Sequence, residues 1–116
     1  YPGVVCIFAS IIGGALGSYL GNPGGHSVYY YIPHILKFFD QPQMVASLAP
    51  RALLVVHSQN DRYVSPESVP QMEAYARPFY EKLGASDRLK IYMPQGDHDL
   101  TPEILDQITE WFRRWL

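Results

Sequence analysis

Two short apolar runs, each followed by a polar turn, place the strongest constraint on what this chain can fold into. Residues 52–56 are continuously apolar and lead into the turn HSQNDRYV, which carries Asp61. Residues 89–93 are largely apolar and lead into the turn PQGDHDL, which carries His98. Apolar runs of this length are typical of strands that are covered on both faces, as in parallel sheets. Because the carboxyl ends of parallel strands meet at one edge of the sheet, we expect Asp61 and His98 to lie close together there.

A further strand is predicted near the start of the sequence. Residues 4–9, VVCIFA, are β-branched and aromatic without polar alternation, which again favours a buried strand. Residues 10–50 are rich in Gly, Pro and Tyr and are predicted to form mostly loop. Within that segment we expect a short helix over residues 32–39 and one helical turn over residues 43–48, which Pro50 ends.

The sequence Ser65-Pro66-Glu67 predicts the start of a longer helix. A hydroxyl cap, a proline at the first helical position and an early acid all stabilise a helix N-terminus. Pro70 places the regular part of the helix near its own position, Pro78 predicts a kink, and Gly84 predicts a left-handed cap at the end. Apolar residues that recur at helical spacing predict one buried stripe, made of Met72, Tyr75, Ala76, Phe79 and Leu83.

The same type of start signal, Thr101-Pro102-Glu103, predicts a second long helix. Apolar residues follow it with a helical period, and charged or amide side chains fill the other face. The predicted apolar face consists of Ile104, Leu105, Ile108, Trp111, Phe112, Trp115 and Leu116.

The order of these elements predicts the fold class. Strand, long crossover, strand, helix, strand and helix make an α/β fold, with a parallel sheet joined by helical crossovers. A chain of 116 residues that is 47% hydrophobic fits one small domain with a core, spanning residues 1–116.

Composition and motifs exclude several kinds of function. A net charge of −2 and scattered Lys and Arg residues argue against nucleic acid as a partner. No apolar stretch approaches the roughly 20 residues that a membrane-spanning helix needs, so no membrane association is predicted. No cofactor is predicted, because no glycine-rich loop links a strand to a helix, and no His or Cys cluster has the spacing of a metal site. The single Cys6 excludes an internal disulfide framework and is expected to be a buried thiol.

A histidine and an aspartate on adjacent strand ends match the needs of nucleophilic catalysis. A hydroxyl nucleophile at neutral pH needs a base, and the base needs a carboxylate that selects its tautomer and stabilises the imidazolium. We predict that His98 is the base and that Asp61 is the acid. Asp97 and Asp99 flank His98 and are alternatives for the acid or for a small metal site, although adjacent residues in a turn rarely point the same way.

The residues of these strands and turns resemble the C-terminal half of α/β-hydrolases, over roughly residues 48–116. The closest resemblance is to esterase-like members related to acetyl xylan esterases, dienelactone hydrolases and the catalytic domain of prolyl-oligopeptidase-type peptidases. The segment APRALLVVH resembles the penultimate strand of that family, HSQNDRYVSPE its acid turn and PQGDHDLTPE its histidine turn. This resemblance implies that Asp61 is the triad acid and His98 the base. Ser58 stands where the family often has Gly, which bears on the shape of the turn.

A less extensive resemblance concerns residues 29–40, YYYIPHILKFFD, which look like the variable family segment that lines an acyl pocket. Its three adjacent tyrosines cannot all face a core. They are expected either to form a wall of such a pocket or to pack with an exposed rim.

The nucleophile that the family carries on a G-x-S-x-G elbow is not found in this sequence. Gly25-His26-Ser27-Val28-Tyr29 is the nearest pattern, but a loop precedes it and Tyr29 replaces the second glycine. Ser10 lacks both glycines. The chain also opens on Tyr1 without an initiator Met. We therefore expect residues 1–116 to be a single partial α/β-hydrolase domain that lacks the upstream nucleophile half, and that half is its expected partner.

The function expected from the sequence is that of the C-terminal piece of a serine hydrolase that cleaves carboxylic esters. Asp61 and His98 are its triad members, and the substrate is a small-molecule ester or an acylated sugar. Peptide cleavage by a prolyl-oligopeptidase-type enzyme is an alternative, because the same triad cleaves both bonds. A non-catalytic α/β module is the other alternative.

Overall fold

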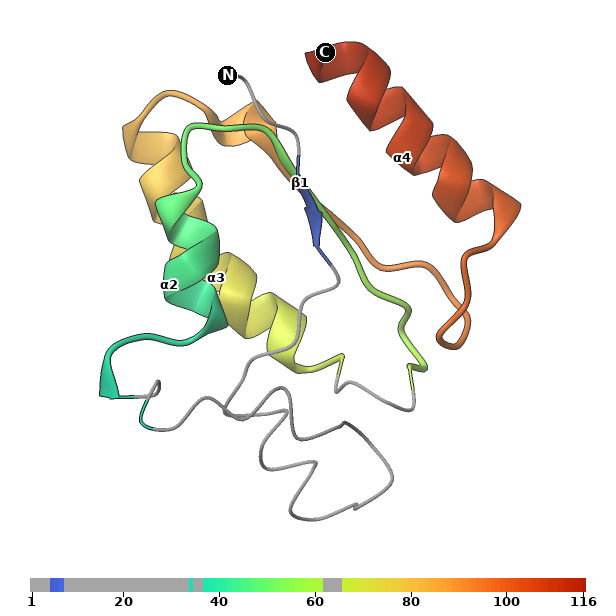
Figure 1. Ribbon diagram of the computed structural model, residues 1–116, viewed down its shortest axis with the longest axis horizontal. Coiled ribbons are helices and arrows are strands. Elements are labelled where there is room, and N and C mark those ends of the chain that lie inside the picture. The colour runs from blue at the N-terminus through green and yellow to red at the C-terminus, as the bar shows by residue number, and fades with distance from the viewer. Residues whose placement is uncertain (1–4, 8–33, 35–36, 62–65) are drawn as a thin grey trace.

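The computed structural model of the chain describes residues 5–7, 34, 37–61 and 66–116, and all structural statements below concern these residues (Figure 1). They contain a parallel sheet of three strands in the order β1-β2-β3. The strands are β1 (Val5–Ile7), β2 (Leu53–Val56) and β3 (Leu89–Tyr92). Each lies inside a predicted run, so the predicted α/β class with a parallel sheet is confirmed.

The central strand β2 is buried along its whole length because helices cover both faces of the sheet. Leu53 and Val55 pack in one core with α2 (Gln41–Ser47) and α3 (Ser68–Lys82), whereas Leu54 and Val56 pack in a second core with α4 (Pro102–Trp115). Figure 1 shows α2 and α3 on one side of the strands and α4 on the other. This arrangement explains the unbroken apolar run in the sequence, since alternate side chains of a strand point to opposite faces.

Helix α2 begins earlier than the predicted helical turn over residues 43–48. Asp40 is its N-cap and forms a capping box with Gln43: the Asp40 carboxylate accepts the Gln41 N–H at 2.7 Å, and the Gln43 side chain accepts the Asp40 N–H at 3.0 Å. Pro42 fits the first turn because the amide of that position has no helical partner. The pattern Asp-x-x-Gln was visible in the sequence and identifies this start.

Helix α3 begins at Ser68, three residues after the Ser65 cap that the sequence predicted. Glu67 takes the N-cap position without a side-chain hydrogen bond, and Ser65 lies outside the described residues. The helix continues through Pro78, and the predicted kink there stays a prediction. A short 3-10 turn, η3 (Ser86–Arg88), then leads into β3.

The buried face of α3 differs from the predicted stripe. Met72 and Ala76 are buried as predicted, but Tyr75, Phe79 and Leu83 are 42%, 46% and 56% exposed. Their places in the core are taken by Val69 and Tyr80, which pack with Met72 and Ala76 against β2 and α2. Residues 75, 79 and 83 recur every four positions and therefore form one edge of the apolar face, and that edge lies beyond the contact with the sheet.

Helix α4 has the predicted start and most of the predicted face. The Thr101 hydroxyl accepts the Ile104 N–H at 3.3 Å, and Ile104 and Trp111 are buried. The prediction is wrong for Leu105 and Leu116, which are 49% and 81% exposed. The remaining predicted members, Ile108, Phe112 and Trp115, are partly buried.

Several predicted features fall on residues that the structure does not describe. The predicted helix over residues 32–39 is affected in part: residues 32, 33, 35 and 36 are not described, and His34 and Lys37 are joined in a turn by a 3.0 Å backbone hydrogen bond. The side chain of Cys6 is another. Within the described segments, no helix has both the length and the apolar character needed to cross a membrane.

Gly84 closes α3 in the predicted left-handed conformation, with φ +67°. Its N–H bonds the Glu81 carbonyl at 3.0 Å, and the Ala85 N–H bonds the Tyr80 carbonyl at 2.8 Å, which is the Schellman arrangement.

A Cβ at the position of Gly84 would meet nothing within 4 Å. We therefore expect Gly84→Ala to lower the free energy of unfolding by about 1–2 kcal/mol through backbone strain alone, measured by denaturant titration. Gly84→Asn, which tolerates this conformation, should lose less, and equal losses would contradict the strain argument.

The buried phenol of Tyr80 should make the stability of the core depend on pH, which can be tested. Its side chain is fully buried, and burial raises the pKa of its phenol to about 12 from the ordinary value near 10. Because the unfolded chain releases the proton first, the stability contributed by the neutral phenol is complete below about pH 10 and is lost as the pH rises toward 12. We expect the wild-type protein to lose at least about 1 kcal/mol more than Tyr80→Phe between about pH 8 and pH 11. Parallel curves of unfolding free energy against pH for the two proteins would disprove this.

Candidate active site

The two polar turns after β2 and β3 lie against each other at the carboxyl edge of the sheet. The parallel ladder continues past the strand ends, because the His57 N–H bonds the Tyr92 carbonyl at 3.0 Å and the Gln59 N–H bonds the Pro94 carbonyl at 2.9 Å. The Asn60 N–H then bonds the carbonyl of Gly96 at 3.0 Å. Two segments far apart in the sequence are thus held side by side where the sequence predicted a site.

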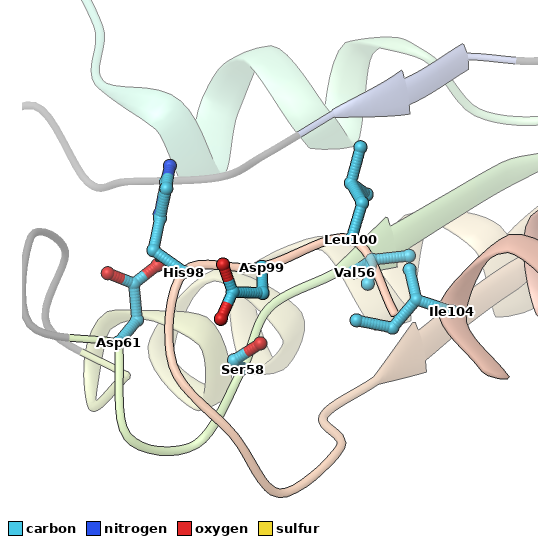
Figure 2. Close-up of a pocket in the computed structure, with 7 residues that line it drawn as sticks. All are labelled: Val56, Ser58, Asp61, His98, Asp99, Leu100 and Ile104. Atoms are coloured by element: carbon cyan, nitrogen blue, oxygen red, sulfur yellow. The ribbon is translucent and has the colours of Figure 1, made fainter. Parts of the chain in front are cut away.

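The side chains of Asp61 and His98 meet at this edge, as predicted. Nδ1 of His98 lies 2.8 Å from Oδ2 of Asp61, which is hydrogen-bonding distance (Figure 2). The Asp61 side chain is only 6% exposed, whereas that of His98 is 48% exposed. The carboxylate is therefore covered while the imidazole is accessible, and the ring presents its other nitrogen, Nε2, on the edge opposite Asp61.

Local backbone contacts explain how each turn presents its side chain. The Asp61 N–H bonds the Ser58 carbonyl at 3.3 Å, which closes the turn after β2. In the second turn Gly96 has φ +135°, a conformation that side-chain-bearing residues rarely adopt. The Asp97 carboxylate accepts the backbone N–H of His98 at 2.8 Å. Asp97 thus bonds the main chain of the histidine turn, and Asp61 is the carboxylate at the imidazole ring.

A pocket with a cavity volume of about 340 Å³ adjoins this pair. Apolar side chains from β2, the histidine turn and α4 form one part of its wall, and polar side chains of the two turns form the other (Figure 2). The lining residues are Val56, Ser58, Asp61, His98, Asp99, Leu100 and Ile104. A mixed wall of this kind suits a small molecule that has both an apolar part and a polar reacting group.

The Asp61–His98 pair can provide the proton acceptor of an acid–base reaction. A carboxylate bonded to Nδ1 holds the imidazole in the tautomer whose Nε2 can accept a proton. It also stabilises the imidazolium that forms when the proton arrives. The pair therefore has the geometry of a general base and its orienting acid.

The carboxylates that flank His98, the other histidines and the serines take different positions. Asp99 lines the pocket, but it is Asp61 whose carboxylate bonds the His98 ring. His57 is 3% exposed and buried at the end of β2, and His34 lies in an exposed turn. Ser10, Ser27, His26 and residues 29–31 lie outside the described residues. No group of three or more His, Cys, Asp or Glu side chains that could hold a metal ion is found in the described part of the chain.

Sequence reasoning did not identify Gln59, Gln95 or Leu100 as parts of this region. Leu100 lines the pocket, and the two glutamines are hydrogen-bonded to each other between the turns. Their position beside Asp61 and His98 in the turn sequences was the available signal, but a glutamine in a polar turn has no distinctive pattern.

Comparison with known proteins supports a hydrolase of the esterase type. No protein-family model matches the chain. Over 95 residues it is 28% identical to the Bacillus subtilis protein named "Putative hydrolase YtaP", covering 82% of this chain. A glucuronoyl esterase of carbohydrate esterase family 15 from Caldicellulosiruptor kristjansonii has a similar structure, with a TM-score of 0.63 and 31% identity over 67% of this chain. The structure of the methylesterase BT1017 matches with a TM-score of 0.54 and 27% identity over 63% of this chain.

The matches cover most of this chain but a small part of each relative. The chain spans about a third of the length of YtaP, 32%, and 20% of the glucuronoyl esterase from Caldicellulosiruptor kristjansonii. It spans 16% of the methylesterase.

The conformation of Gly96 generates a prediction about the geometry of the pair. Nothing lies within 4 Å of a Cβ built at Gly96, so Gly96→Ala should act through backbone strain, at a cost of about 1–3 kcal/mol of unfolding free energy. Because the strained turn carries His98, this variant should also weaken the Nδ1–Asp61 hydrogen bond, observed as loss of the low-field proton resonance of that bond. Gly84→Ala is the matched control, since it strains a turn away from the pocket. Retention of the resonance in Gly96→Ala would show that the turn tolerates the side chain without moving His98.

Proposed function

This chain has an α/β-hydrolase fold, of which its sheet and helices fit the C-terminal portion, and we propose that it supplies the base and the acid of a serine hydrolase that cleaves carboxylic esters. The observation that carries the proposal is the 2.8 Å contact between His98 and Asp61, at the carboxyl edge of the sheet and beside a pocket. The likeness to two esterases supports the same reaction class.

In the proposed reaction the base works through Nε2 of His98. That nitrogen takes the proton of a serine hydroxyl while the oxygen attacks the ester carbonyl carbon. As the tetrahedral intermediate collapses, the imidazolium returns the proton to the oxygen of the leaving alcohol. A water molecule then repeats both steps on the acyl-enzyme, which releases the acid and restores the serine. Asp61 remains ionised throughout and stabilises the imidazolium.

We place the serine and the oxyanion hole in a part of the protein that precedes this chain. The sequence contains no G-x-S-x-G elbow, and the chain covers only 32% of the length of its hydrolase relative. The exposed imidazole of His98 also leaves room for a nucleophile from another segment.

The proposed substrate is a small ester, either free or carried on a sugar. The apolar part of the pocket wall, Val56, Leu100 and Ile104, matches an acyl or alkoxy group of modest size. The names of the solved relatives, a glucuronoyl esterase and a methylesterase, support an ester attached to a carbohydrate. Peptide substrates have no corresponding support among these relatives.

The proposal is tested by two substitutions in the intact protein, with an activated ester such as 4-nitrophenyl acetate as substrate. His98→Ala removes the base and should lower kcat by several orders of magnitude. Asp61→Asn keeps the size of the side chain but favours the wrong imidazole tautomer, and should lower kcat by about 10⁴-fold.

Gln71→Ala is the control, because Gln71 is exposed on α3 and does not line the pocket. It should leave kcat unchanged. Wild-type activity in folded His98→Ala protein would eliminate the triad assignment, and absence of hydrolysis in the intact wild-type protein would favour a non-catalytic module. Cleavage of a peptide amide with a higher kcat/KM than the ester would assign the protein to the peptidases instead.

A further inference from the structure

The side chain of Gln59 connects the two turns that carry Asp61 and His98. Its Nε2 donates to the carbonyl of Met93 at 2.7 Å, at the end of β3. Its Oε1 accepts a hydrogen bond from Nε2 of Gln95 at 2.6 Å, within the histidine turn. Both bonds join positions more than thirty residues apart in the sequence.

The backbone of Gln59 belongs to the same connection. Its N–H bonds the Pro94 carbonyl at 2.9 Å, so a single residue makes three hydrogen bonds to three successive residues, Met93, Pro94 and Gln95. Gln59 is thereby tied to the start of the histidine turn by both its main chain and its side chain. This residue precedes Asp61 by two positions, and Gln95 precedes His98 by three.

These bonds lie where they can affect the geometry of the two turns more than the stability of the fold. Gln59 and Gln95 are exposed, and hydrogen bonds between exposed groups contribute little to folding because water competes for both partners. They do restrict how the two turns can slide or separate. The Asp61–His98 contact joins the same two turns, and its histidine side chain is half exposed.

We propose that Gln59 is a positioning residue that holds the turn of Asp61 in register with the turn of His98, so that the carboxylate stays at Nδ1. This inference rests on the proposed esterase function. Loss of the Gln59 side chain leaves the backbone ladder intact but allows the turns to shift relative to each other. Displacements of about 1 Å at a catalytic pair commonly lower the rate by up to about 10²-fold.

The test measures kcat and KM of the intact protein with 4-nitrophenyl acetate. Gln59→Ala should lower kcat by about 10- to 100-fold and leave KM within about twofold, because the residue does not line the pocket. Gln95→Ala removes one of the two side-chain bonds and should have a smaller effect. Gln59→Glu keeps the acceptor for Gln95 but loses the donor to Met93, so its kcat should lie between those of wild type and Gln59→Ala.

A double-mutant cycle with Asp61→Asn distinguishes positioning from a general loss of structure. If Gln59 acts through Asp61, Gln59→Ala should lower kcat much less in the Asp61→Asn background than in wild type. The low-field proton resonance of the Nδ1–Asp61 bond should also weaken in Gln59→Ala. Gln71→Ala, an exposed glutamine on α3, is the control for the substitution itself and should match wild type.

Three results would overturn the inference. The first is a wild-type kcat in Gln59→Ala, and the second is a change of KM alone in that variant. The third is that Gln59→Ala lowers kcat equally in the wild-type and Asp61→Asn backgrounds. Failure of the proposed function has a different signature, namely wild-type activity in His98→Ala and Asp61→Asn. Gln59→Glu keeps the length and polarity of the side chain, so it provides the same comparison if Gln59→Ala does not fold.

Discussion

The parallel pairing of β2 with β3 is the interaction on which the rest of the structure depends. Leu53–Val56 are paired in register with Leu89–Tyr92, and the hydrogen bonds continue past both strands to Gln59 and Asn60. A parallel ladder brings equivalent ends of two strands to one edge, which an antiparallel pair would not do. Asp61 and His98 therefore meet although 36 residues separate them in the chain. The helices cover the sheet, and the ladder determines where its polar ends emerge.

Cover on both faces of the sheet stabilises this ladder and explains why the central strand β2 carries only apolar side chains. Leu53 and Val55 face α2 and α3, and Leu54 and Val56 face α4. Full burial of a Leu or Val side chain contributes about 1.5–3 kcal/mol, so each position on β2 contributes separately to stability. At the end of α4, Trp115 is flanked by the guanidinium groups of Arg88 and Arg114, which lie 5.2 Å and 4.9 Å from its ring centroid. The contact of Arg88 joins α4 to the segment that precedes β3.

The different exposure of the two site residues follows from the same architecture. The turn after β2 is central in the sheet and is covered by its neighbours, so the Asp61 side chain is only 6% exposed. The turn after β3 is at the edge of the described sheet, and His98 projects from it with 48% exposure. A covered carboxylate can hold the ring through its hydrogen bond to Nδ1. An accessible imidazole can reach a substrate, so the two environments suit an orienting acid and a base, respectively.

The sequence by itself determined the features that depend on near neighbours in the chain. The Thr101 cap, the left-handed Gly84 and the three strands were predicted because capping, glycine conformations and apolar runs act over a few residues. The Asp61–His98 contact was also predictable, because strand-end turns of a parallel sheet converge. Only the tertiary structure decided that Tyr80, which the predicted stripe did not include, enters the core in place of Phe79, since the position of the sheet selects which edge of the helix is buried. It alone revealed the bonds from Gln59 to Met93 and Gln95, because such contacts depend on the register between two distant turns and leave no periodic signal in the sequence.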